Sequence, residues 1–471
     1  MFKQRPLIRT LLLTFILLPF ISCDNAKEAQ METWIGGEII NPKTDHVILL
    51  KDNVPFDTVK LDDRNFFKYN CKKLKQGLYS FQHSEFQVFF LEPGDSIMLR
   101  VNTVDFDESL TYSGRGAEKN NFLMELFLNN EAERKTITSW YTLTPKVYEM
   151  KLDSMREIRN SIYNEFNSTY DPSEEFKRVA KANIEYAYNA NKELYVSINH
   201  PRFINPEEDY PKGFFDYRKD INFGDKDLQS YYPYYRFLDW YFDNLSFQKY
   251  KEKKYLDRKS FIHNYNKIKI IDSFITNDTL RNRMLRSVAR RYFVHAKDAS
   301  HEQQMLDLFL KLNTNEDDRK EIVALAEATM KLTPGNKIPN VLLVNTDNMM
   351  KDLQSVINKP TVIYFWSTGS IKHFKTIHTR VAELQDKYPE FDFTGINTDT
   401  HFKKWRDVVR KSGYNKQFEF QLEDLEKAEA ALVINSANKA IIVDKDGTIL
   451  EGNTNLFNSL IEAQLLGILN K

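Results

Sequence analysis

Ser370 and His373 are the pair whose residue types and spacing could do chemistry. They follow an apolar run over residues 361–366, and together they could imitate the nucleophile and base of a hydrolase, while His373 and His378 could share a metal ion. Nucleophilic catalysis also needs an oriented base and an oxyanion hole, and the chain has no Gly-x-Ser-x-Gly elbow. Histidines five residues apart lie on different helix faces. We therefore expect no catalytic residue, metal ligand or cofactor, and Ser370 is expected to cap a helix, worth about 1 kcal/mol.

The chain has two cysteines, Cys23 and Cys71. Disulfide exchange needs a thiolate and a second thiol that can leave, so one spare cysteine cannot support it. Cys71 ends an alternating segment in which Phe67 and Tyr69 share its face of a predicted strand. A free cysteine is usually a small buried hydrophobe, so we expect Cys71 in a core.

The N-terminus predicts export. Basic residues precede an apolar run over residues 11–21, which is too short to span a membrane and suits the apolar part of a secretory signal. Ser22 and Cys23 then make the segment resemble a bacterial lipoprotein signal, and the resemblance implies that Cys23 is acylated after cleavage. Phe20 departs from the usual leucine, and an ordinary secretory signal or an uncleaved anchor is the alternative. We expect an anchored protein of the cell envelope, at the outer membrane and facing the periplasm.

Composition predicts a soluble body with no nucleic-acid partner. The 66 Lys and Arg residues balance 66 Asp and Glu residues, and aromatic residues make up 13% of the chain, enough for packed cores. The length of 471 residues predicts about three domains of roughly 150 residues each.

The pattern along the chain predicts a multidomain α+β protein. A signal over residues 1–23 and a linker over 24–31 precede residues 32–115, where short strand-like runs and turns recur about every ten residues and predict an antiparallel β sandwich or barrel. Residues 116–333 have helical spacing, interrupted by an irregular stretch over residues 201–234.

Residues 334–471 predict an α/β domain. The run over residues 361–366 is continuously apolar, as in a parallel strand covered on both faces, and a helix and a second strand over residues 391–398 follow. We expect a further helix over residues 349–357, a hairpin that turns at residues 444–447 and a closing amphipathic helix.

Two sets of residues in the helical middle are expected to have structural roles only. The aromatic cluster over residues 231–242 could stack on sugars or bind a peptide if exposed, but aromatic residues at helical spacing are more often core. The arginines over residues 283–291 are expected to form a solvated helix face.

The C-terminal region resembles the TlpA-like thioredoxin-fold proteins. The resemblance lies in residues 334–339 (PGNKIP), 359–366 (KPTVIYFW) and 443–449 (VDKDGTI). The β-rich region resembles a domain of unknown function that often precedes such modules in envelope lipoproteins of Bacteroides-type bacteria, through residues 91–97 (LEPGDSI) and 114–121 (GRGAEKNN).

The resemblance implies a thioredoxin-like domain with a degenerate redox site. By position, the family's nucleophilic cysteine falls on Ser370, its resolving cysteine on His373, its strand aromatic on Trp366 and its cis-proline on Asn438. We expect a trans bond before Asn438, because a cis bond costs about 3 kcal/mol without proline. The reshaped groove is expected to be lined by Trp366 and Gly369.

These features predict a binding protein. The groove would recognise a peptide or an envelope protein partner through shape and backbone edges, without exchanging disulfides. One alternative is a thioredoxin-superfamily enzyme that acts without its own dithiol, and another is a structural spacer whose groove is buried between domains.

Overall fold

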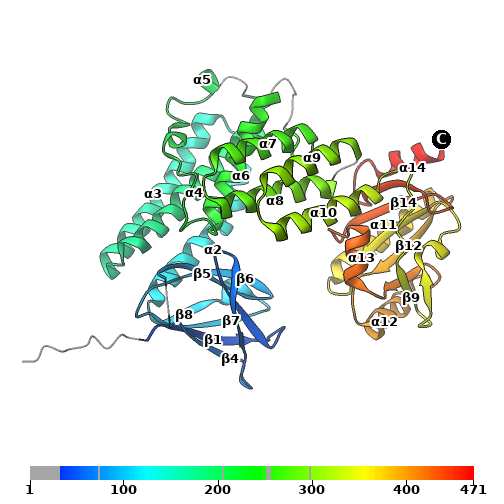
Figure 1. Ribbon diagram of the computed structural model, residues 1–471, viewed down its shortest axis with the longest axis horizontal. Helices are drawn as coiled ribbons and strands as arrows, with labels where there is room; N and C mark the ends of the chain where they lie inside the picture. Colours follow the sequence, from blue (N-terminus) through cyan, green and yellow to red (C-terminus); the bar gives the residue numbers. More distant parts are fainter. Residues whose placement is uncertain (1–31, 73–74, 204–205, 251–255, 296–298, 471) are drawn as a thin grey trace, which may run out of the picture. The chain divides into compact units, whose positions relative to one another are not determined.

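The computed structural model describes residues 32–72, 75–203, 206–250, 256–295 and 299–470, which fall into two compact units. The first unit ends at Glu125 and the second begins at Leu126. Figure 1 follows the chain from the blue strands through the green helices to the yellow and orange sheet. The expected signal and linker, Cys23 included, lie outside the described residues. Within the described ranges, no helix has both the length and the apolar character of a membrane span.

The first unit contains two four-stranded sheets. In spatial order, one consists of β4 (Phe66–Asn70), β1 (Trp34–Ile40), β7 (Ser96–Asn102) and β8 (Thr111–Arg115), and the other of β3 (Val54–Lys60), β2 (His46–Lys51), β5 (Gly77–His83) and β6 (Glu85–Leu91).

The pairs in these sheets are antiparallel as predicted, with one exception. β1 runs parallel to β7, with Trp34 opposite Ser96 and Ile40 opposite Asn102. The prediction of a purely antiparallel domain is wrong at this pair. Short hairpins enforce antiparallel pairing, whereas β1 and β7 are joined through the whole intervening set of strands, a connection long enough for a parallel pair.

The two motifs that distinguish the β-rich region meet in one buried cluster. Lys119, in the first turns of α2 (Ala117–Ser139), places its ammonium 3.0 Å from both carboxylate oxygens of Asp95 and 2.5 Å from Glu92. The next residue, Asn120, exchanges two hydrogen bonds with the backbone of Phe90 at 2.6 and 2.9 Å. The motifs therefore fasten the start of α2 to the end of β6 and the turn that follows it.

Long helices fill the middle of the chain. They include α3 (Pro145–Tyr170), α4 (Glu174–Asn199), α6 (Tyr232–Phe247), α7 (Phe261–Phe274), α8 (Asp278–His295), α9 (Ala299–Leu312) and α10 (Glu316–Lys331). Pro145 occupies the first turn of α3, where its missing N–H costs nothing, and the Ser173 hydroxyl caps α4 by accepting from the Phe176 N–H. Within the described part of residues 201–231, only the short α5 (Pro206–Asp209) and a 3-10 turn over residues 216–220 are helical.

The expectation for the aromatic cluster is largely confirmed. Tyr234, Phe237 and Phe242 have no exposed surface and form part of the helical core, while Tyr232 is 57% exposed. The expected solvated arginine face is wrong for Arg291, which donates to Asp239 at 3.1 Å. The cause is the placement of a carboxylate on another helix, α6, which periodicity within α8 cannot reveal.

The C-terminal part holds a seven-stranded mixed sheet. Its spatial order is β10 (Met350–Asp352), β9 (Leu342–Asn345), β13 (Glu419–Leu422), β12 (Asp392–Asn397), β11 (Thr361–Trp366), β14 (Lys439–Val443) and β15 (Ile449–Asn455). The helices of this part are α11 (Ile371–Lys387), α12 (Phe402–Ser412), α13 (Leu425–Leu432) and α14 (Ile461–Leu469). β11 runs parallel to β12 and antiparallel to β14, as the predicted βαβ unit and hairpin require.

The helix expected over residues 349–357 is wrong. The chain instead forms β10 and a 3-10 turn over residues 353–356. Asn348 adopts a left-handed backbone with φ of 61°, which asparagine tolerates better than most residues, and so reverses the chain into an antiparallel pair with β9.

The apolar strand β11 is covered on both faces, as predicted. Val362, Tyr364 and Trp366 enter one buried cluster, and Ile363 and Phe365 enter the other. The continuous apolar run thus indicates a central strand between two layers, which holds the segment that follows it in a fixed place.

Candidate functional site

The predicted site lies where β11 ends and α11 begins. Ser370 is the N-cap of α11, and its hydroxyl accepts a hydrogen bond from the His373 N–H at 3.4 Å, so the capping role is confirmed. Gly369 and Ser370 are exposed. In open α/β sheets, ligands bind in the crevice beyond the carboxyl ends of parallel strands, and this loop occupies that position.

His373 and Asn438 are brought together across the site. A 2.9 Å hydrogen bond joins His373 Nε2 to Asn438 Oδ1, and both residues are half-buried. The peptide bond before Asn438 is trans, as expected. A hydrogen bond between side chains therefore connects the first turn of α11 to the residue before β14.

Trp366 does not line a groove, and that expectation is wrong. Its side chain is 1% exposed, and its indole N–H donates to Glu419 Oε2 at 2.9 Å. Alternation along β11 places Trp366 on the same face as Tyr364, against the helix α11. The tryptophan is therefore part of the core beneath the loop that follows β11. Of the two expected groove residues, Gly369 is the one that is accessible.

Glu419 is a buried carboxylate that sequence reasoning missed. It accepts hydrogen bonds from Tyr364 Oη at 2.9 Å and from the Trp366 indole, and His378 Nε2 lies 3.2 Å from its Oε1. The His378 ring in turn stacks on Tyr414 with centroids 3.7 Å apart. Burial, followed by the nearby Glu419 charge, raises the pKa of Tyr364 well above its usual value, so this hydroxyl stays a donor.

Gly395 makes room for that carboxylate. A Cβ atom built on Gly395, which lies in β12, would lie 2.6 and 2.7 Å from the two Glu419 oxygens and 2.7 Å from Tyr364 Oη. Real Cβ atoms do not approach other atoms so closely, so a side chain here would displace the carboxylate.

Asp399 holds the loop between β11 and α11. Its carboxylate accepts from Ser367 Oγ and from the Thr368 N–H, both at 2.6 Å, and from Asn397 Nδ2 at 3.0 Å. Burial by itself would raise the pKa of Asp399, but these hydrogen bonds outweigh it and lower the pKa below its usual value. The loop that presents Gly369 is therefore anchored by an ionised side chain.

Cys71, the single cysteine of the described residues, is half-buried at the rim of a cavity, so its expected place in a core is wrong. It directly follows β4, at the sheet margin, and lines this cavity together with Tyr69 and Tyr79. Burial raises the pKa of its thiol to about 11, so at neutral pH it is almost entirely the unreactive thiol.

The described part of the chain has no candidate metal site. There, no group of three or more His, Cys, Asp or Glu side chains could hold an ion. His373 and His378 hydrogen-bond to different partners, Asn438 and Glu419 respectively. The structure does not bring the two histidines to one site.

Residues 358–449 match the family model described as thioredoxin-like. The chain contains a thioredoxin-like domain. A comparison with curated proteins found no match.

Three solved structures illustrate what the chain resembles. A thioredoxin-like protein from Bacteroides caccae is 13% identical over 59% of this chain and 93% of its own, with a TM-score of 0.35. The thioredoxin domain of a thiol-disulfide oxidoreductase from Bacteroides vulgatus is 17% identical over 29% of this chain and 96% of its own, with a TM-score of 0.24. A thiol:disulfide interchange protein from Bacteroides sp. is 18% identical over 30% of this chain and 90% of its own, with a TM-score of 0.24.

Gly395→Ala tests whether the buried carboxylate supports the thioredoxin-like domain. We expect it to destabilise the domain by about 1–3 kcal/mol, because the new methyl group overpacks the site of Glu419. Urea denaturation followed by tryptophan fluorescence measures the change. Gly467→Ala is the matched control: its Cβ meets nothing within 4 Å in helix α14, and it should be neutral or stabilising by up to about 1 kcal/mol. Equal stability of Gly395→Ala and the wild type would contradict the role given to Gly395.

Proposed function

We propose that this protein is an envelope lipoprotein whose thioredoxin-like domain binds a peptide or protein partner and does not exchange disulfides. The observation that carries the proposal is the hydrogen bond between His373 and Asn438, at the positions where the family would place a cysteine and a cis-proline. Neither an imidazole nor the Ser370 hydroxyl can form and release a disulfide.

The local surface supports binding. Ile371, the first residue of α11, is 63% exposed and directly follows the exposed Gly369 and Ser370, so an apolar side chain stands beside an exposed loop. Extended peptides are recognised through backbone hydrogen bonds and pockets for alternate side chains. Below this surface, Asp399 and Glu419 fix the loop and the strand, so the surface is already organised before a partner arrives.

An insulin-reduction assay with dithiothreitol tests the absence of redox activity. We expect the wild type to give the same rate as dithiothreitol alone, because no thiolate is present at position 370 or 373. Ser370→Ala should behave identically. Turnover by the wild type that Ser370→Ala abolishes would instead favour an enzyme that acts with an external thiol.

Site-specific photocrosslinking tests partner binding. We expect a benzoylphenylalanine at position 371 to capture a discrete peptide or protein from envelope extract. The yield should fall severalfold when Asn438→Ala removes the contact to His373 and loosens the surface. The same label at Lys375, exposed one turn further along α11, is the matched control. Equal capture from both positions would argue against a site at the helix start.

The lipid anchor rests on the sequence around Cys23. The apolar run over residues 11–21 and Ser22 precede the cysteine as in bacterial lipoproteins. We expect the protein expressed in a Bacteroides-type host to partition into the detergent phase of Triton X-114. Cys23→Ser should move it to the aqueous phase or leave its signal uncleaved. A wild type that partitions with water would exclude the anchor.

A further inference from the structure

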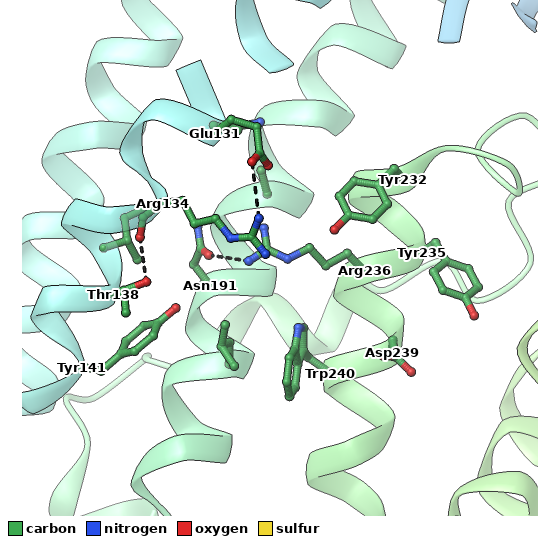
Figure 2. A pocket seen from close by; sticks show the side chains of 14 residues that line it. Glu131, Arg134, Thr138, Tyr141, Asn191, Tyr232, Tyr235, Arg236, Asp239 and Trp240 are labelled. Atoms are coloured by element: carbon green, nitrogen blue, oxygen red, sulfur yellow. Dashed lines mark hydrogen bonds and ion pairs between the residues drawn. The ribbon is translucent and has the colours of Figure 1, made fainter. Parts of the chain in front are cut away.

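The helical part contains a pocket of about 310 Å³ that the proposed function does not use. Its walls come from α2, α4 and α6, with Tyr141 from the turn after α2 (Figure 2). Small-molecule sites occupy about 300–1,000 Å³, so this pocket has room for a small ligand such as a single ring with substituents. We call it the helical pocket.

Two arginines enter the helical pocket from opposite walls. Figure 2 shows the side chains of Arg134, from α2, and Arg236, from α6, reaching into the same space. Arg134 makes a long 3.4 Å contact to Glu131, and both of those side chains are largely exposed. Among the described residues, Arg236 makes one hydrogen bond, to the uncharged Asn191 at 3.1 Å, and no ion pair. A half-buried guanidinium that has only an amide partner carries a partly desolvated charge, which a bound anion would stabilise.

Asp239, which also lines the pocket, cannot supply that anion. Its carboxylate is already held by Lys267 at 2.5 Å, Arg258 at 2.7 Å and Arg291 at 3.1 Å. Burial would raise the pKa of Asp239, but these three cations outweigh burial and lower the pKa strongly. Because three cations already surround this carboxylate, it does not neutralise Arg236. Glu131, the other carboxylate of the lining, pairs with Arg134, so Arg236 is left without a carboxylate partner among the described residues.

Aromatic side chains form a further part of the wall. Tyr141, Tyr232, Tyr235 and Trp240 line the pocket, and Figure 2 shows Tyr232 and Trp240 on either side of Arg236. The Arg258 guanidinium lies over the Trp240 ring, 4.1 Å from its centroid, and this cation–π contact helps to hold the indole in place. Aromatic rings offer flat apolar surfaces to a ring, and a guanidinium offers a planar fork that matches a carboxylate.

We propose that the helical pocket binds a ring-bearing carboxylic acid, such as an acidic sugar, with its carboxylate on Arg236 and Arg134 and its ring against the aromatic wall. The two arginines supply the charge and the fork geometry. The aromatic wall supplies the preference for a ring over a bare anion. This site is independent of the surface at the start of α11.

The test uses methyl β-D-glucuronide, which has a single ring, with methyl β-D-glucoside as the matched ligand that carries a CH2OH group in place of the carboxylate. Isothermal titration of the purified protein from residue 26 onward should give saturable binding of the glucuronide with a Kd of about 1 mM or tighter. The glucoside and inorganic phosphate should bind at least tenfold more weakly. Failure of the glucuronide to bind, or equal binding of the glucoside or of phosphate, would overturn the proposal.

Arginine variants locate the binding. Arg236→Gln should weaken glucuronide binding about tenfold or more, which corresponds to losing about 1.4 kcal/mol. Arg134→Gln removes a largely exposed side chain, so it should fold normally and still weaken binding severalfold. Arg410→Gln, an exposed arginine of α12, is the matched control and should leave the Kd unchanged. Unchanged affinity in Arg134→Gln and Arg236→Gln, with native circular dichroism, would place the ligand elsewhere.

Discussion

The thioredoxin-like domain depends on one buried carboxylate, Glu419. Three neighbours turn toward it, and two of them, Tyr364 and Trp366, belong to the central strand that leads into the candidate site. A buried charge is tolerated only when donors surround it, so the donors and the space beside Gly395 are required together. The arrangement fixes the end of β11, and with it the loop whose exposed residues form the proposed binding surface.

The order of elements in this domain could be predicted because its signals are local. The apolar run of β11, the helical spacing of α11 and the Asp-Gly turn each lie within a few residues of one another, and all three are found where the sequence predicts them. Ser370 could likewise be recognised as a helix cap from its position alone. These features need no knowledge of distant parts of the chain.

What could not be predicted depends on partners far away in the sequence. Strand β13 carries Glu419 and Gln421 at alternate positions, a pattern typical of a surface strand, yet both are buried. Glu419 lies among Tyr364, Trp366 and His378, and Gln421 donates to Asn397 Oδ1 and to the Asp399 carbonyl, partners that are distant in the sequence. The same limit explains Trp366, which the family position marks as part of a groove but which points into the core. Arg291 and Asp239 lie 52 residues apart, and only the folded bundle, in which α6 and α8 both pack against α7, brings their charges together.

Asp239 belongs at once to the wall of the helical pocket and to the buried charge cluster of the bundle. Its removal would leave Lys267, with no exposed surface, without one of its counter-charges, whatever happens in the pocket. Selection for a folded bundle is therefore enough to keep an acid at this position over evolutionary time. In homologues, retention of this aspartate alone would not distinguish chains that keep a ligand from chains that have lost it, whereas the residue aligned with Arg236 would.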